Sequence, residues 1–208
     1  MRASPRAWWE TLEPVAPDVV AVWRQIDPDD FSDDYSAARE ELSRRAGPGS
    51  AARVLAQQEA IGDALEAILA EMPDSLLQAP GGEEDWNVAQ AFAHTTGSRR
   101  YLAAAAAMAA TGKWPTDDPP RIVPGVPGPA DADREVLMTY LNKSRRSMAL
   151  SAAAIAGHEA DPCPMDHPLI GDRLLCGEWL LFAGVHDLMH LEQLHKLLQR
   201  GRDGGAPG

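Results

Sequence analysis

Four long segments of this chain carry apolar side chains at helical spacing, which predicts α-helix for most of its length. The first runs from about Ser50 to Met72 and forms one apolar stripe at steps of three, four and seven residues. Pro73 ends it, because proline cannot donate the backbone hydrogen bond that a helix needs. The residues of the stripe are Val54, Ile61, Leu65, Ile68 and Leu69.

The other three segments have recognisable helix ends. The second spans 87–112, where Asn87 and Gln90 have the spacing of a capping box. The third begins at residue 131 or 133 and ends near 157–158. The fourth spans 174–200, and a glycine follows it.

The connections are predicted to be loops. Residues 113–130 hold six prolines, a density that excludes a helix and disfavours a strand. Such a long link fits the crossover of a bundle with non-adjacent neighbours. The short runs 54–58 and 121–125 have neither a strand partner nor a hairpin turn. We therefore predict an all-α four-helix bundle over 48–201, followed by a disordered tail at 202–208.

The first 47 residues differ from the rest. They carry a tryptophan pair at 8–9 and an acidic run at 27–34. We predict a helical N-terminal extension packed through its tryptophans, with a functional lid as the alternative. Its short helices are expected near 6–12, 17–26 and 33–45.

Composition and charge exclude several classes. Hydrophobic residues make up 45% of the chain, enough for a sizeable core, and the formal net charge is -12. That charge would repel nucleic acid and anionic membranes. No run approaches the about 20 apolar residues of a membrane span, and there is no signal-peptide pattern. With only two cysteines, the prediction is a cytoplasmic protein acting on a small molecule.

His186 and His190 carry the strongest chemical signal. They are four residues apart in the fourth segment, so both imidazoles lie on one helix face, one turn apart. That face is otherwise apolar, and buried imidazoles need partners, which one metal ion would supply to both. A pair of interior histidines hydrogen-bonded to other side chains is the alternative. Asp187 stands where a zinc protease has glutamate, which disfavours that class.

His94 is the candidate third ligand. It lies in the middle of the second segment, with Gln90, Ser98 and Tyr101 on nearly the same face. Bundle sites are built from inward side chains of different helices. Three imidazoles would leave coordination positions open, as a catalytic metal requires.

At these residues the chain resembles the DinB-like superfamily. The resemblance rests on residues 86–94 (WNVAQAFAH) and on the late segment 167–194 with its HxxxH pair, and it covers about residues 50–200. It implies a four-helix bundle and a divalent transition metal, zinc or nickel, held by His94, His186 and His190. The family includes thiol S-transferases that use bacillithiol-like thiols and mycothiol-dependent maleylpyruvate isomerases.

Other polar residues are interpreted more plainly. Tyr101 is the candidate proton relay, and Glu178 is offset from the His186 face by roughly a quarter turn. His195 and the pair Arg99–Arg100 are predicted at the surface, and His167 in a turn.

A rival metal site would use both cysteines. Its spacings match no structural zinc pattern and include no CxxC. Cys176 is interpreted as an ordinary half-buried cysteine. The rival residues are His158, Cys163, His167 and Cys176.

Two classes of function follow. In the first, a three-histidine metal and a low-molecular-weight thiol attack a small electrophile, or the metal activates water for hydrolysis. In the second, the same pocket holds a metal or small ligand without catalysis, as a stress-response module. The sequence does not separate them, and it leaves the oligomeric state, including a homodimer, open.

Overall fold

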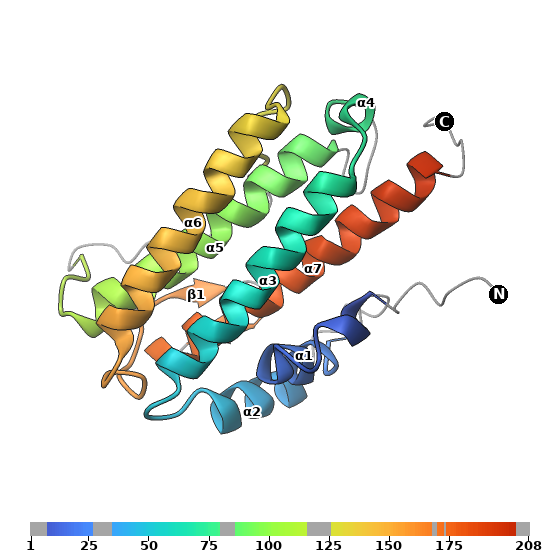
Figure 1. Ribbon diagram of the computed structural model, residues 1–208. Helices are drawn as coiled ribbons and strands as arrows, with labels where there is room; N and C mark the ends of the chain where they lie inside the picture. Colours follow the sequence, from blue (N-terminus) through green and yellow to red (C-terminus); the bar gives the residue numbers. More distant parts are fainter. Residues whose placement is uncertain are drawn as a thin grey trace.

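The computed structural model describes residues 8–26, 35–79, 86–115, 126–167, 170–172 and 174–202. Four long helices form its body (Figure 1). The predicted all-α bundle is therefore confirmed. The long helices are α3 (Ala51–Glu71), α5 (Val88–Ala110), α6 (Arg134–Ile155) and α7 (Cys176–Arg202).

The helix ends follow from the residues that cap them. The Asn87 side chain accepts from the backbone N–H of Gln90, and the Gln90 side chain accepts from that of Asn87. Asp133 caps α6 in the same way, accepting from the N–H of Val136 at 2.9 Å. Helix α7 continues through Gly201, which packs against the Leu76 side chain, and ends at Arg202. The predicted end at residue 200 is thus two residues early.

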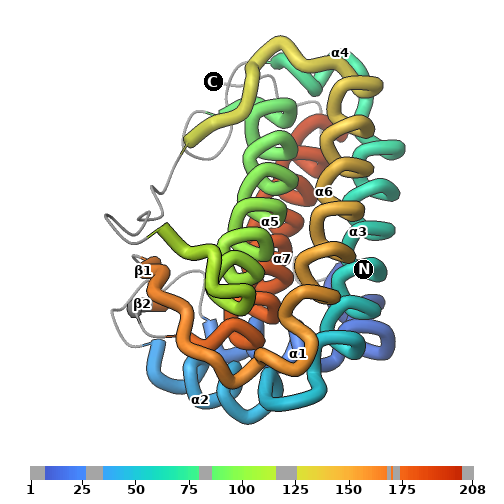
Figure 2. The backbone as a smooth tube through the Cα atoms, turned by 90° about the vertical axis from the view of Figure 1, so that its left-hand side faces the viewer, coloured from blue at the N-terminus to red at the C-terminus, as the bar shows by residue number. Residues whose placement is uncertain are grey.

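The chain direction is up, down, down, up (Figures 1 and 2). Helix α5 packs along α6 and α7, and α3 packs along the same two helices, so α3 and α5 lie diagonally. Helices α5 and α6 run parallel as neighbours, so the proline-rich link returns along the whole bundle. The predicted crossover is present. It joins α5 and α6, which lie side by side, whereas α3–α5 and α6–α7 are the diagonal pairs.

Several short elements complete the fold. Helix α4 packs near the start of α5, and a two-stranded antiparallel sheet precedes α7. Sequence analysis missed these elements, because two-residue strands carry no periodic signal. The run 54–58 lies within α3, and 121–125 lies outside the described residues. The short elements are η1 (Trp9–Thr11), α1 (Pro17–Trp23), α2 (Ser36–Arg45), α4 (Asp74–Leu77), β1 (Asp166–His167) and β2 (Gly171–Asp172).

The N-terminal helices pack against α7 and α3. The buried carboxylate of Asp18 pairs with Arg45 at 2.8 Å, and its backbone N–H donates to the Gln57 side chain. Trp23 is buried, and Trp8 stacks on His195 with ring centroids 5.1 Å apart. The extension packs through its tryptophans as expected. Its boundary at residue 47 stays a prediction, and the acidic run 27–34 and the tail residues 203–208 lie outside the described residues.

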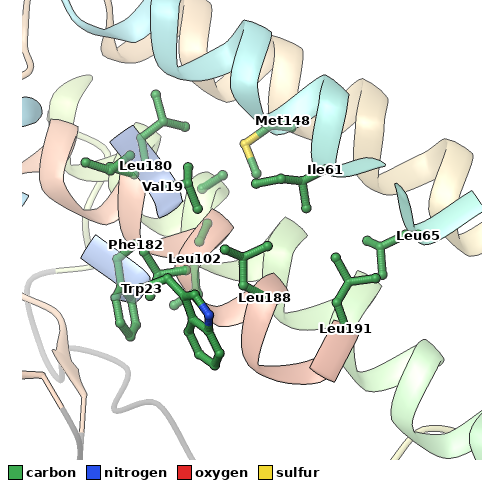
Figure 3. Close-up of a cluster of buried hydrophobic side chains, with 14 of the residues drawn as sticks. Val19, Trp23, Ile61, Leu65, Leu102, Met148, Leu180, Phe182, Leu188 and Leu191 are labelled. Carbon is green, nitrogen blue, oxygen red and sulfur yellow. The ribbon is translucent and has the colours of Figure 1, made fainter. Parts of the chain in front are cut away.

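The apolar core fills the space between the four long helices. Ile61 and Leu65 from α3 meet Met148 from α6, and Leu188 and Leu191 from α7 lie beneath them (Figure 3). All are almost fully buried. Within the described part of the chain, no helix has the length and apolar character that crossing a membrane requires.

Candidate metal centre

His94 is held in place by the returning link. Its Nδ1 lies 2.7 Å from the carbonyl oxygen of Val126. Gly128 donates its N–H to the carbonyl of Gln90, and a Cβ at Gly128 would lie 2.3 Å from the Cβ of Ala93. Glycine therefore lets the link lie directly on α5. Because a carbonyl only accepts, Nδ1 carries the proton and Nε2 carries the lone pair.

His186 and His190 lie one turn apart on α7, with ring centroids 4.6 Å apart. His190 Nδ1 lies 3.0 Å from Gln193 Oε1, which again places the proton on Nδ1. Nδ1 of His186 is buried without a hydrogen-bond partner. Burying a ring nitrogen without a hydrogen-bond partner costs free energy. A metal ion bound by this ring would offset that cost, either by binding Nδ1 itself or by binding the other nitrogen and fixing the tautomer.

The three rings converge between α5 and α7. One nitrogen of each lies within 4.8 Å of the other two. His94 lies 4.7 Å from His190 and 5.4 Å from His186 between ring centroids. A tetrahedral zinc ion would hold such nitrogens about 3.4 Å apart, so modest side-chain rotation completes the set. The donor set thus fits zinc or another imidazole-preferring ion.

The His186 and His190 rings are neutral at physiological pH. Burial lowers the pKa of His190 to about 4, and it lowers that of His186 well below its ordinary value. Repulsion from the neighbouring histidines lowers the His186 value further. Neutral imidazole is the form that binds metal, so burial prepares the ligands.

The site is open on one side. His186 is buried, whereas His94 and His190 are half-buried. The edge of Trp86 meets the His94 ring at 4.9 Å, and Ser98 Oγ lies 3.4 Å from His94 Nε2. The partial exposure of His94 and His190 leaves this part of the triad accessible to solvent.

The prediction for Arg99 was wrong. Its side chain is fully buried, with Nη1 3.4 Å from Oδ2 of an equally buried Asp187. Arg99 also donates from Nη2 to the carbonyl of Gln58 in α3. Burial raises the pKa of Asp187 to about 7 against the lowering effect of Arg99. Arg100 is exposed as predicted.

Tyr101 stays a prediction as a proton relay. It is 39% exposed and follows His94 by two helical turns, a rise of about 10 Å. Burial raises its pKa. Ser98, one turn from His94, is the hydroxyl that the structure brings to the ligand set.

One other polar prediction, for His195, needs correction. His195 is half-buried under Trp8 rather than at the surface. Glu178 accepts from Ser43 Oγ and from the backbone N–H of Leu175, so it caps α7.

His167 is buried in β1 with its ring edge-on to Phe182 at 5.0 Å. Burial lowers its pKa to about 4.

The rival metal site is not assembled. Among the described residues, potential ligands come close enough together to hold an ion at the histidine triad, and not at the rival site. Cys163 and Cys176 are both buried, and Cys176 is fully so rather than half-buried. His158 pairs with Asp161 at 2.7 Å on the surface.

Three features of the candidate site were not predicted from the sequence. Gln193 follows His190 by three residues, so an HxxxHxxQ spacing was available as a signal. The Val126 carbonyl lies in a loop whose path no pattern fixes. The partnership of Arg99 with Asp187 depends on how α5 and α7 align.

The comparisons with known proteins agree with this geometry. No curated protein and no solved structure gave a significant match. The family model described as the DinB superfamily matches residues 57–194, which include all three histidines. The chain belongs to the DinB superfamily.

Proposed function

We propose that this protein binds one divalent transition ion, zinc or nickel, through His94, His186 and His190, and that it is a metal-dependent thiol S-transferase. The observation that carries the proposal is the convergence of three imidazoles with one ring nitrogen of each within 4.8 Å of the others. The partial exposure of His94 and His190 supports access by a small molecule, as in catalytic rather than closed structural sites.

The chemistry divides between the ion and the chain. A divalent ion held by neutral imidazoles supplies Lewis acidity, which lowers the pKa of a thiol or water that binds it. In the transfer, the S–H bond breaks, a bond from sulfur to the electrophilic carbon forms, and the proton leaves with the displaced group.

The protein residues orient the site. Val126 and Gln193 fix the tautomers of His94 and His190, so that Nε2 of each is the nitrogen with a lone pair to offer a metal. Trp86 covers one flank of His94 and excludes water there. Ser98 Oγ is the hydroxyl beside the ligands that could hold a proton or a polar substrate atom.

Two other functions share the same site. A non-catalytic metal or ligand carrier would use the triad without turnover, and a hydrolase would use water in place of the thiol. The substrate in each case is a small molecule, and the charge of -12 argues against nucleic acid.

Elemental analysis of untagged protein tests the metal. We expect close to one zinc or nickel ion per chain, and its loss from the His186→Ala/His190→Ala variant. His158→Ala is the matched control, because His158 lies at the surface away from the triad. Full occupancy in the double variant would refute the proposed site.

Cobalt substitution tests the thiol. Addition of a low-molecular-weight thiol at neutral pH should produce a thiolate charge-transfer band, and His94→Ala should abolish or alter it. Turnover is then sought with an electrophilic acceptor. A cobalt spectrum that thiols leave unchanged would refute S-transfer and leave hydrolysis or binding.

A further inference from the structure

The core side of the α5–α7 interface carries a buried ion pair at the level of the triad. Arg99 and Asp187 are both 0% exposed, with 3.4 Å between Nη1 and Oδ2. Arg99 follows His94 by five residues, and Asp187 lies between His186 and His190. One charged contact therefore joins α5, about one and a half turns after His94, to the turn of α7 that carries His186.

A third helix fixes the guanidinium. Arg99 donates from Nη2 to the backbone carbonyl of Gln58 in α3. Arg99 is thereby tied to α3 as well as α7. Its position along α5 is set from two directions.

Stability alone does not account for this pair. Neither carboxylate oxygen of Asp187 makes a hydrogen bond, and neither do Nε and Nη1 of Arg99. A buried ion pair with so few hydrogen bonds recovers little of its desolvation cost, and apolar residues of similar size often give equal or greater stability. The pair must therefore contribute something that packing does not.

Alignment and charge are two such contributions. Asp187 is adjacent to His186 on the chain, so holding its carboxylate against Arg99 fixes the rotation of that turn of α7 relative to α5. Three neutral imidazoles bring no charge to a dication, and the ion pair presents its carboxylate end on the residue next to His186, while the guanidinium of Arg99 is held toward α3.

We propose that Arg99 and Asp187 are positioning residues of the metal centre, which hold His94 in register with His186 and His190 and stabilise the bound dication. This inference rests on the proposed function. It assigns the pair a role in metal affinity that is separate from its role in folding.

The decisive variant replaces both charges with apolar residues of similar size, Arg99→Met/Asp187→Leu. It leaves no buried charge unpaired, so it should fold with wild-type or greater stability. Its zinc affinity, measured by competition with a chromophoric chelator, should fall 10- to 100-fold, the usual effect of losing outer-shell support. The cobalt absorption spectrum should change as well. Asp187→Asn, which keeps the shape, should weaken zinc binding in the same direction.

Arg134→Met is the matched control. Arg134 ties α6 to α3 through the carbonyls of Leu69 and Met72, and to α4 through Asp74, on helices without a ligand. It should lower stability but leave zinc affinity within about threefold.

The outcomes separate the two claims. Failure of the wild-type protein to bind zinc would refute the proposed function itself. Wild-type zinc affinity and an unchanged cobalt spectrum in the folded double variant would overturn the positioning role alone. If Asp187→Asn does not fold, the double variant still decides.

Discussion

Two helix interfaces in this bundle each contain an arginine, and they use it differently. Between α3 and α6, Arg145 reaches Asp63 at 2.8 Å and Glu66 at 2.9 Å near the surface, over an apolar interior. Between α5 and α7, Arg99 lies inside, against one carboxylate. In the first arrangement, water screens the charged groups. In the second, the charged groups are buried, which costs desolvation free energy.

The difference indicates where function lies. Natural proteins depart from simple apolar packing mainly at functional sites. In the described residues, the α5–α7 interface departs twice, with the partly exposed histidine triad and with the buried Arg99–Asp187 pair. The described α3–α6 interface instead directs its arginine, Arg145, toward the exposed carboxylates of Asp63 and Glu66, so it serves as an internal reference.

The largest expected effect compares the two arginines. Arg99→Met should lower the free energy of unfolding by about 3–5 kcal/mol, because it leaves Asp187 buried without a counter-charge. Arg145→Met should cost about 0–1 kcal/mol, since its pairs are exposed to solvent. Urea unfolding at low and high salt measures both. Equal losses, or a salt-sensitive loss at Arg99, would break the comparison.

A smaller effect concerns pH. His167 has a pKa of about 4 in the fold, below its ordinary value near 6.5. Below pH 6.5 the unfolded chain binds the extra proton, so stability is fully present above 6.5 and is lost as pH falls toward 4. The loss should reach about 3 kcal/mol for this residue.

His167→Phe should flatten that part of the stability curve, because phenylalanine does not titrate and keeps a ring beside Phe182. Chemical unfolding of metal-free protein from pH 4 to 7 gives the curve. An identical slope in the variant would mean that His167 is not the titrating group.

Sequence alone predicted the features that depend on local order. Helix periodicity and the caps at Asn87 and Asp133 depend on residues close together in the sequence, so the long helices and their starts were predicted closely. The HxxxH pair shares a face by helix geometry alone. We predicted His94 as the third ligand because a polar residue on a buried helix face needs a polar partner.

What failed depends on contacts between distant segments. Arginine is usually exposed, and no local pattern shows that α5 places Arg99 opposite Asp187. The same holds for His195, which Trp8 covers from far along the chain. Each error concerns a partner far away in sequence, which composition and spacing cannot identify.

The smallest expected effect compares two helix caps. Asn87→Ala and Asp133→Ala should each cost about 1 kcal/mol, since each removes one capping acceptor, and should lower Tm by about 2–4 °C. Their effects on the metal should differ. Asn87 also donates to the carbonyl of Ala130, so it anchors the link whose Val126 carbonyl holds His94. Asn87→Ala should therefore weaken zinc binding a fewfold, while Asp133→Ala, on a helix without a ligand, should leave it unchanged. Equal zinc affinities in two variants of equal stability would show that the link does not orient His94.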